Sequence, residues 1–382
     1  MKPGLPVVYL TVFIDLLGFG LILPQLPFYA EKFGATGLWV GAILTAYSAA
    51  QLVGASLLGR LSDRVGRRPI LLLSLAGSAA SFLLSGLADS LWLLLLARAL
   101  AGLFGGSIAA AQAVIADVTA PTERAKYMGL LGASIGLGFV FGPALGSLLA
   151  PFGFGAAAFA AAGVAAANLV FAFFRLPETR AAEARRHAHA RLAFSNFVDA
   201  LRHPSIGRLL AATFFSTLAF VAMEATFALL GEARFGLDAS RLGLVFAYVG
   251  VVMVVVQGGL VGRLAPRFGE RALATTGSLL MAVSLGALPL VPSLGAALGV
   301  LAGLAVGQGL TTPMLSTLLS RATDADEQGG TLGLGQSLAA AARAVGPLGA
   351  GWLYDRAVGA PYAASAAVMV LAAVLVGTAR TD

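Results

Sequence analysis

The chain has 382 residues, 58% of them hydrophobic and only 11% charged, with a net charge of +7 and a mean hydropathy of +0.88. A soluble globular domain has about 25% charged residues, so this composition excludes a soluble protein and predicts a membrane protein. The absence of cysteine from the sequence excludes disulfides and thiolate metal sites.

Twelve helices are expected from stretches that carry few or no charges and end at charged residues, glycine or proline. A single membrane crossing takes roughly 20 residues, so about twelve crossings fit a chain of this length. The first stretch is expected to be a retained span, because no cleavage site follows it. The expected helices cover residues 7–29, 37–58, 69–87, 91–114, 127–150, 154–174, 207–231, 240–262, 271–290, 294–318, 328–353 and 360–378.

One connection is much longer than the others and divides these helices into two sets of six. It runs from Arg175 to Arg208 and holds seven arginines, three acids and all three histidines. We therefore expect a six-helix bundle at residues 1–174, a cytoplasmic linker at 175–206 and a second six-helix bundle at 207–382. The histidines are interpreted as part of a solvated linker, and neither a metal nor a cofactor is expected.

The basic residues are concentrated in the connections on one side of the expected membrane. That side, which includes both chain ends, holds 19 of the 25 lysines and arginines. Because loops rich in lysine and arginine stay in the cytoplasm, both termini are expected there. The excess positive charge then sets topology and contacts anionic membrane lipid, and nucleic-acid binding is not expected.

The sequence also repeats itself between its halves. GRLSDRVGRR at residues 59–68 recurs as GRLAPRFGER at 262–271, and Gly142-Pro143 recurs as Gly346-Pro347. The two pairs are offset by 203 and 204 residues, so nearly the same shift relates both. Such repetition implies two bundles of common ancestry and is typical of transporters whose halves move about a central site.

The charged connection between the second and third helices has a specific pattern. Its glycines permit a tight turn and its arginines hold both helix ends at the cytoplasmic surface, so topology alone is one explanation. The spacing GxxxDRxGRR also resembles the signature loop of the major facilitator superfamily. The matching residues are Gly59, Asp63, Arg64, Gly66, Arg67 and Arg68.

The resemblance extends along the chain. DLLGFGLILPQLP, which begins at Asp15, is similar to the first-helix motif of the drug/proton antiporter branch, especially the tetracycline-type exporters. RALAGLFGGS, which begins at Arg98, is similar to the fourth-helix motif with its buried arginine. The fifth-helix antiporter motif, in which Ser147 replaces the last glycine, is matched at Gly129, Gly138, Gly142, Pro143 and Gly146.

This resemblance implies an all-α integral membrane protein with the major facilitator fold, in which two six-helix bundles surround a midplane cavity. It also implies a conformational latch, in which Asp63 pairs with Arg67 and an acid near the end of the fourth helix, best matched by Asp117, joins them. Two carboxylates repel each other, so we interpret Asp117 as a partner of Arg67. Pro266 replaces the aspartate in the second-half copy, and no equivalent latch is expected there.

Four ionisable residues, Asp15, Arg98, Glu224 and Arg343, lie well inside expected spans. A charge at the bilayer centre costs about 2.5 to 3.5 kcal/mol, so each one needs a partner or a wet cavity. Counting along the helices places Asp15 and Arg98 within about 8 Å of each other in depth. They form either an ion pair that fixes packing or a proton site, since burial and a nearby arginine change a carboxylate's proton affinity in opposite directions.

Glu224 and Arg343 fall in the outer halves of their helices, and we expect them to pair in the second bundle. Three interpretations of Glu224 stay open. It is a second proton site, it contacts a cationic substrate, or it binds only its own arginine.

The glycines of the fifth helix have two interpretations. Small residues about one turn apart make a groove for tight helix crossing, which is the default for membrane bundles. In antiporters the same motif is associated with sealing the two bundles against uncoupled leak. We favour sealing, because Pro143 adds a bend at the crossing.

Uncharged polar and aromatic residues inside the spans form a predicted substrate cavity. A few polar groups within an apolar, aromatic cavity suit amphipathic organic molecules, although each alone is more often a contact between helices. The set is Gln25, Tyr47, Gln51, Gln112, Phe215, Phe227, Tyr248, Gln257, Gln308 and Gln336.

The sequence therefore predicts a monomeric antiporter of the bacterial inner membrane that exports small amphipathic drugs or metabolites in exchange for protons. The alternative is a facilitator or proton symporter for sugars or other small nutrients. GASIG at residues 132–136 fits a hydrolase motif, but it lies inside an expected helix, so an enzyme is not expected. Gln25 departs from the tetracycline-type motif, which usually has an apolar residue there, so tetracycline is one candidate among several.

Overall fold

The computed structural model describes residues 4–105, 107–119, 121–178, 203–323 and 328–379. All regular secondary structure in these ranges is helical. The side chains of Asp63 and Asp117 lie outside the described part, and so do most residues of the predicted linker.

In the first half, the helix α1 (Leu5–Ile22) continues through a 3-10 turn, η1 (Leu23–Gln25), into α2 (Leu26–Glu31). A second 3-10 turn, η2 (Ala150–Phe152), lies between the last two helices of this half. The remaining helices are α3 (Gly37–Val65), α4 (Arg67–Gly86), α5 (Leu91–Phe104), α6 (Ser107–Val118), α7 (Pro121–Leu149) and α8 (Phe154–Arg175).

In the second half, α12 (Ala239–Val255) passes through a π-helical turn, η3 (Val256–Leu260), into α13 (Val261–Phe268). A 3-10 turn, η4 (Leu288–Leu290), ends the helix that follows. The other helices are α11 (Pro204–Phe235), α14 (Glu270–Ala287), α15 (Leu294–Arg321), α16 (Gln328–Arg356) and α17 (Ala360–Thr378).

Every stretch that was expected to be helical is helical over most of its length. Within the described ranges, ten helices are long and apolar enough to cross a membrane. Two of the twelve expected stretches are not among these ten: 91–114, which is divided into α5 and α6, and 328–353, which forms α16. The all-helical membrane architecture predicted from composition is therefore confirmed.

The sequence predicted that residues 59–68 form a loop between two spans. In the structure most of these residues are helical. α3 continues to Val65 and α4 begins at Arg67, so Gly66 alone separates them, with φ 124° and ψ 160°. The second-half copy behaves alike, since Gly269 separates α13 from α14 with φ 77° and ψ 154°. Glycine tolerates these positive φ values, so each helix runs on past its apolar segment before it turns.

The chain folds into two compact units. Unit 1 comprises Met1–Ala35, Ala46–Arg191 and Asp238–Ala247, and unit 2 comprises Thr36–Thr45, Leu192–Leu237 and Tyr248–Asp382. The first turns of α3 and of α12 thus group with the other half of the sequence. The predicted domain bounds, 1–174 and 207–382, stay a prediction.

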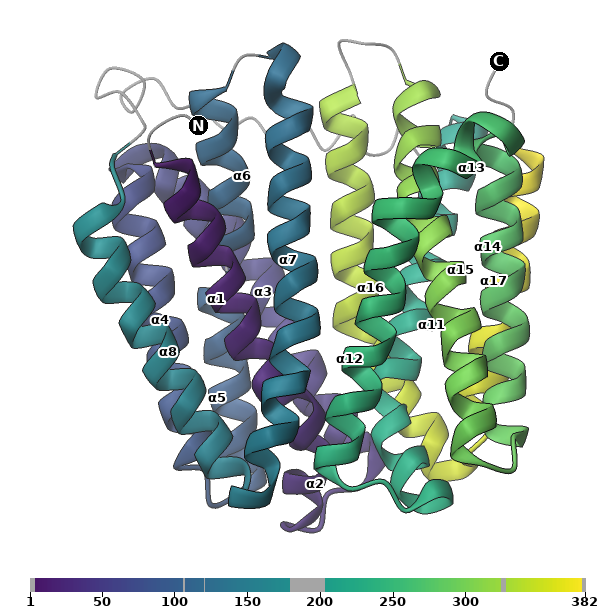
Figure 1. Ribbon diagram of the computed structural model, residues 1–382, viewed down its shortest axis with the longest axis horizontal. Coiled ribbons are helices and arrows are strands. Elements are labelled where there is room, and N and C mark those ends of the chain that lie inside the picture. Colours follow the sequence, from purple (N-terminus) through teal and green to yellow (C-terminus); the bar gives the residue numbers. More distant parts are fainter. Residues whose placement is uncertain (1–3, 106, 120, 179–202, 324–327, 380–382) are drawn as a thin grey trace. The chain divides into compact units, whose positions relative to one another are not determined.

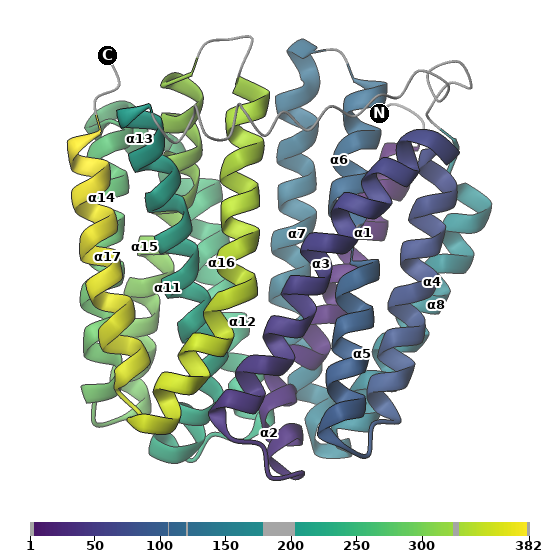
Figure 2. The ribbon, with the colours of Figure 1, turned by 180° about the vertical axis from the view of Figure 1, so that it is seen from behind.

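Each unit uses the same scheme of helix packing. In unit 1, α1 packs against α7 and α8, and α4 packs against α5 and α8. In unit 2, α11 packs against α16 and α17, and α14 packs against α15 and α17. Figure 1 and the reverse view in Figure 2 show α1 beside α7, and α14 beside α15 and α17. The internal repeat in the sequence is therefore also a repeat of packing.

An apolar cluster holds one end of unit 1 together. It is built from buried side chains of α1, α4 and α6, including Val8, Leu71 and Ile115. Two helical turns along α1 from Val8, this apolar packing gives way to buried polar side chains around Asp15. The candidate site lies where the packing changes from apolar to polar.

Candidate functional site

Asp15 lies in the middle of α1, with 9% of its surface exposed. The hydroxyl of Ser107, the first residue of α6, donates a hydrogen bond of 2.5 Å to its Oδ2 atom. The hydroxyl of Ser78 on α4 makes a further hydrogen bond to the carboxyl group. Three helices thus meet at one buried carboxylate.

The meeting point lies where the fourth expected helix is interrupted. α5 ends at Phe104, and the carbonyl of Gly105 accepts a hydrogen bond of 3.1 Å from the side-chain amide of Gln51. The same amide donates to the Tyr47 hydroxyl at 3.3 Å. Hydropathy predicted one helix across this point, because glycine is apolar enough to leave the signal unbroken. The Gly105-Gly106 pair was the available sign of a break.

Arg98 is 3% exposed and lies on α5. Its Nη2 atom donates to the Ser85 hydroxyl at 2.8 Å, and its guanidinium lies over the Phe82 ring, 5.7 Å from the centroid. Among the side chains that the structure describes, no hydrogen bond or ion pair joins Arg98 to Asp15. The static ion pair considered for these two residues is therefore not formed, because serines of α4 bind both groups.

Glu224 lies on α11 and Arg343 lies on α16. Glu224 is half-buried, and Arg343 interacts with it electrostatically. The two helices pack along each other within unit 2. The pairing predicted from the sequence and the three interpretations of Glu224 stay predictions.

Arg67 and Arg68 of the predicted latch are the first two residues of α4. The backbone N–H groups of Arg67 and Arg68 donate to the two carboxylate oxygens of Glu178, at 2.9 and 3.3 Å. Arg67 is 7% exposed and also donates to the Ser62 hydroxyl at 3.2 Å. Glu178 was not predicted. The sign available in the sequence was its negative charge shortly after the end of α8, because the N-terminus of a helix attracts negatively charged side chains.

The other latch residues are placed as follows. Arg64 is exposed in the last turn of α3, and a β-carbon at Gly59 would meet no atom within 4 Å. Arg68 donates to the Phe173 carbonyl at 2.7 Å and lies over the Phe173 ring. The side chains of Asp63 and Asp117 are outside the described residues, so their pairing with Arg67 stays a prediction.

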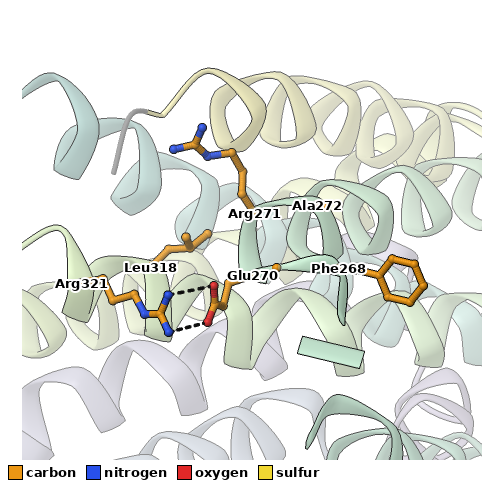
Figure 3. A pocket seen from close by; sticks show the side chains of 7 residues that line it. Phe268, Glu270, Arg271, Ala272, Leu318 and Arg321 are labelled. Carbon is orange, nitrogen blue, oxygen red and sulfur yellow. Dashed lines mark hydrogen bonds and ion pairs between the residues drawn. The ribbon is translucent and has the colours of Figure 1, made fainter. Parts of the chain in front are cut away.

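The second-half copy of this motif contains a different ion pair. Glu270, the first residue of α14, binds Arg321 of α15 at 2.8 and 3.1 Å, as Figure 3 shows. A pocket of about 580 Å³ lies beside this pair. Its lining residues are Phe268, Gly269, Glu270, Arg271, Ala272, Leu318 and Arg321. None of the predicted cavity residues lines this pocket.

The glycines of the fifth-helix motif lie against α1. A β-carbon added at Gly142 would lie 2.7 Å from the Cα atom of Gly20, and one at Gly138 would lie 2.6 Å from the β-carbon of Leu16. Gly146 approaches the Leu21 carbonyl in the same way. α7 and α1 therefore cross closely, as the packing interpretation predicted. Gly129 faces open space instead.

Pro143 and Ser147 of the same motif contact the first turns of α12, which belong to unit 1. A β-carbon at Gly243 would lie 2.7 Å from the Pro143 carbonyl oxygen. The Ser240 hydroxyl donates to the Ser147 carbonyl at 2.9 Å. Sealing of the two bundles by this motif stays a prediction.

Asp355 near the end of α16 binds the start of α3, in the segment that belongs to unit 2. Its Oδ1 and Oδ2 atoms accept hydrogen bonds from the backbone N–H groups of Gly37 and Leu38, at 2.7 and 2.8 Å. The Thr45 hydroxyl accepts one from the Leu348 N–H at 3.2 Å. Asp355 was not singled out from the sequence, because it lies in a short charged helix end that resembles a solvated surface.

Two members of the predicted cavity set do not fit that role. Gln25 is 3% exposed and donates to the Gly146 and Leu21 carbonyls, so it joins η1 to α7. Phe227 is fully enclosed in unit 2. Both were chosen by residue type, which does not show the direction of a side chain. The exposed or half-buried members are Tyr47, Gln51, Gln112, Phe215, Tyr248, Gln257, Gln308 and Gln336.

No group of three or more His, Asp or Glu side chains able to hold a metal ion occurs in the part of the chain that the structure describes.

Comparison with known proteins covers nearly the whole chain. The family described as Major Facilitator Superfamily matches residues 8–347 and 235–382. The class B tetracycline resistance protein of Escherichia coli is 32% identical over 352 residues, which are 91% of this chain and 88% of that protein. Multidrug resistance protein 2 of Bacillus subtilis (strain 168) is 28% identical over 369 residues, covering 94% and 91%. The crystal structure of the human organic anion transporter MFSD10 (TETRAN) is similar with a TM-score of 0.73 and 28% identity, covering 98% of both chains.

Proposed function

The chain belongs to the major facilitator superfamily, and from that premise we propose that it is a proton-coupled antiporter that exports small amphipathic organic molecules. It is a multi-pass membrane protein with a small-molecule substrate, and its family consists of transporters and not of enzymes. Relatives named for tetracycline and multidrug resistance support export of drugs. The alternative of nutrient uptake is not favoured by these relatives.

One observation carries the proton coupling. Asp15 is buried in a membrane-spanning helix, and its described partners are hydroxyl groups and not a cation. An ionised carboxylate in that position costs free energy unless it is neutralised or solvated, so it is suited to exchanging a proton as its surroundings change. Glu224 is the second proton-site candidate, with Arg343 as its partner.

In the proposed cycle, protonation of Asp15 from outside favours the return of the empty carrier. Release of the proton to the cytoplasm then lets the substrate bind. This direction of exchange requires the basic connections and both termini to face the cytoplasm of a bacterial inner membrane, as the distribution of lysine and arginine indicates. We propose that a single chain is sufficient for transport.

The departure at Gln25 does not speak against tetracycline as a substrate. In tetracycline-type exporters the corresponding residue is usually apolar, which raised doubt about this drug. The Gln25 amide here bonds to a carbonyl of α7, so the substitution concerns contact between helices. A panel of compounds that includes tetracycline, tested in a host without its own drug pumps, is the way to find the substrate.

The substitution Asp15→Asn tests the coupling. We expect it to abolish proton-driven export while exchange of substrate across the membrane without a proton gradient continues, because Asn cannot release a proton. Export is measured in inverted membrane vesicles with a compound identified in the panel. The control is Asp238→Asn, an exposed residue that accepts a hydrogen bond from the Arg241 N–H at 2.8 Å. Undiminished export by Asp15→Asn would refute the role of this residue.

A further inference from the structure

We propose that Ser107 and Ser78 are positioning residues that set the pH at which Asp15 releases its proton. The inference deepens the proposed function, since it takes Asp15 as the proton carrier. In the release step, the O–H bond of the protonated Asp15 carboxyl breaks, the proton passes to water, and the electron pair stays on the carboxylate. The two serine hydroxyls then donate to the oxygens of that carboxylate.

The two hydrogen bonds stabilise the ionised form of the carboxyl group against the cost of its burial. Ser107 is 2% exposed and Ser78 is 5% exposed, so both hydrogen bonds are made away from solvent. A hydroxyl that donates to a carboxylate stabilises its charged form. Ser107 is also the first residue of α6, so the positive end of that helix lies beside the carboxylate. The break after α5 thus supplies the donor and the helix end together.

The charged groups on the surrounding helices are placed differently. On α7 and α8, which pack against α1, Glu123 lies in the first turn of α7 and Arg175 is the last residue of α8. On α4, Arg67 and Arg68 lie in the first turn. Arg98 of α5 is buried, but it binds Ser85. For α6 the structure describes no charged side chain. In the described part of unit 1, the side chains that donate hydrogen bonds to Asp15 are therefore the hydroxyls of Ser107 and Ser78.

The serines of α4 separate a positioning role from ordinary helix contacts. Four buried serines, at positions 74, 78, 81 and 85, follow one face of the helix. The hydroxyls of Ser81 and Ser85 donate to carbonyls of their own helix, each at 2.7 Å. Ser78 instead bonds to Asp15 on another helix. Ser81→Ala is therefore a matched control, because it removes a buried hydroxyl from the same face without touching Asp15.

Infrared spectroscopy of the purified, substrate-free protein tests the proposal. The C=O stretching band of a protonated carboxyl is followed against pH, and the part that disappears in Asp15→Asn belongs to Asp15. We expect Ser107→Ala to move the midpoint of this band upward by about one pH unit, because loss of one hydrogen bond to a charged group has about that effect. Ser78→Ala should move it in the same direction. Ser107→Thr, which keeps the hydroxyl, and Ser81→Ala should leave it in place.

The outcomes distinguish this inference from the proposed function. If no titrating band depends on Asp15, the proposed role of Asp15 as proton carrier fails. If the band titrates but Ser107→Ala and Ser78→Ala leave its midpoint unchanged or lower it, the positioning role is refuted. Thermal unfolding of each variant shows whether it is folded. If the Ser107→Ala variant is not folded, the midpoint measured for Ser78→Ala decides whether the positioning role holds.

Discussion

Asp15 and Arg98, which are buried in unit 1, are each bound by a serine of α4, and this arrangement determines what a single substitution does. Asp15 bonds to Ser78 and Ser107, and Arg98 bonds to Ser85. Because the two charges do not bind each other, removing one leaves the described hydrogen bonds of the other intact. Their substitutions should therefore affect stability nearly independently.

Glu224 and Arg343 should behave in the opposite way, since Arg343 acts electrostatically on Glu224. We expect Glu224→Gln and Arg343→Gln to destabilise the protein individually, because each removes one charge of an electrostatic interaction within the membrane. The double variant should recover part of that loss, with a coupling energy of about 0.5 to 3 kcal/mol. Thermal unfolding in detergent of the four proteins gives this energy. A coupling near zero would mean that the pair has no direct role in stability.

At the scale of helices, the glycines of α7 allow its close approach to α1. A β-carbon at Gly142 would lie 2.7 Å from the Cα atom of Gly20, whereas one at Gly129 would meet no atom within 4 Å. Both residues belong to one motif, yet of these two only Gly142 lies at the crossing with α1. The motif therefore combines positions with different physical roles.

Gly142→Ala should destabilise the protein by about 1 to 3 kcal/mol, because the added methyl group pushes two helix backbones apart. Gly129→Ala is the matched control and should be neutral or stabilising by up to about 1 kcal/mol, since alanine favours a helix. Both are measured by thermal unfolding. Equal effects of the two substitutions would show that the crossing does not depend on Gly142.

The start of α3 offers a second test at this scale. Asp355 accepts hydrogen bonds from two N–H groups in the first turn of the helix. Asp355→Ala should cost about 0.5 to 2 kcal/mol, the usual effect of removing a side chain that caps a helix N-terminus. Asp355→Asn keeps one acceptor oxygen and should cost less. A loss equal to that of Asp355→Ala would show that charge, and not hydrogen bonding, holds this contact.

At the scale of the whole molecule, the repeat of the sequence is a repeat of packing. α4 of unit 1 and α14 of unit 2 both begin directly after a glycine with positive φ. The repeat is nevertheless uneven at these starts, because Glu178 binds the first turn of α4, whereas Glu270 of α14 binds Arg321. The two units thus make different contacts at equivalent positions of the repeat.

The proposed orientation can be tested because the chain has no cysteine of its own. We expect single cysteines at the exposed positions Arg64 and Arg267 to react only with a reagent that reaches the cytoplasm. Cysteines at the exposed positions Lys32 and Arg241 should react with an impermeant reagent added outside. Labelling in whole cells and in inverted vesicles measures this, and the reverse pattern would overturn the topology.

The sequence by itself determined the positions of most helices, the repeat and the family resemblance. Lipid excludes unpaired charges, so hydropathy marks the approximate position of each span along the chain. The motif spacings show the family because they depend on residue identity, which the sequence states directly.

Only the tertiary structure decided how helices end and which side chains meet. The connection at Gly66 and the interruption before Ser107 depend on local backbone geometry, which hydropathy does not report. The partners of Asp15 were not predictable, because depth along a helix says nothing about the direction in which a side chain faces. Ser78 and Ser107 lie 63 and 92 residues from Asp15 in the chain, and only packing of α1, α4 and α6 brings them together.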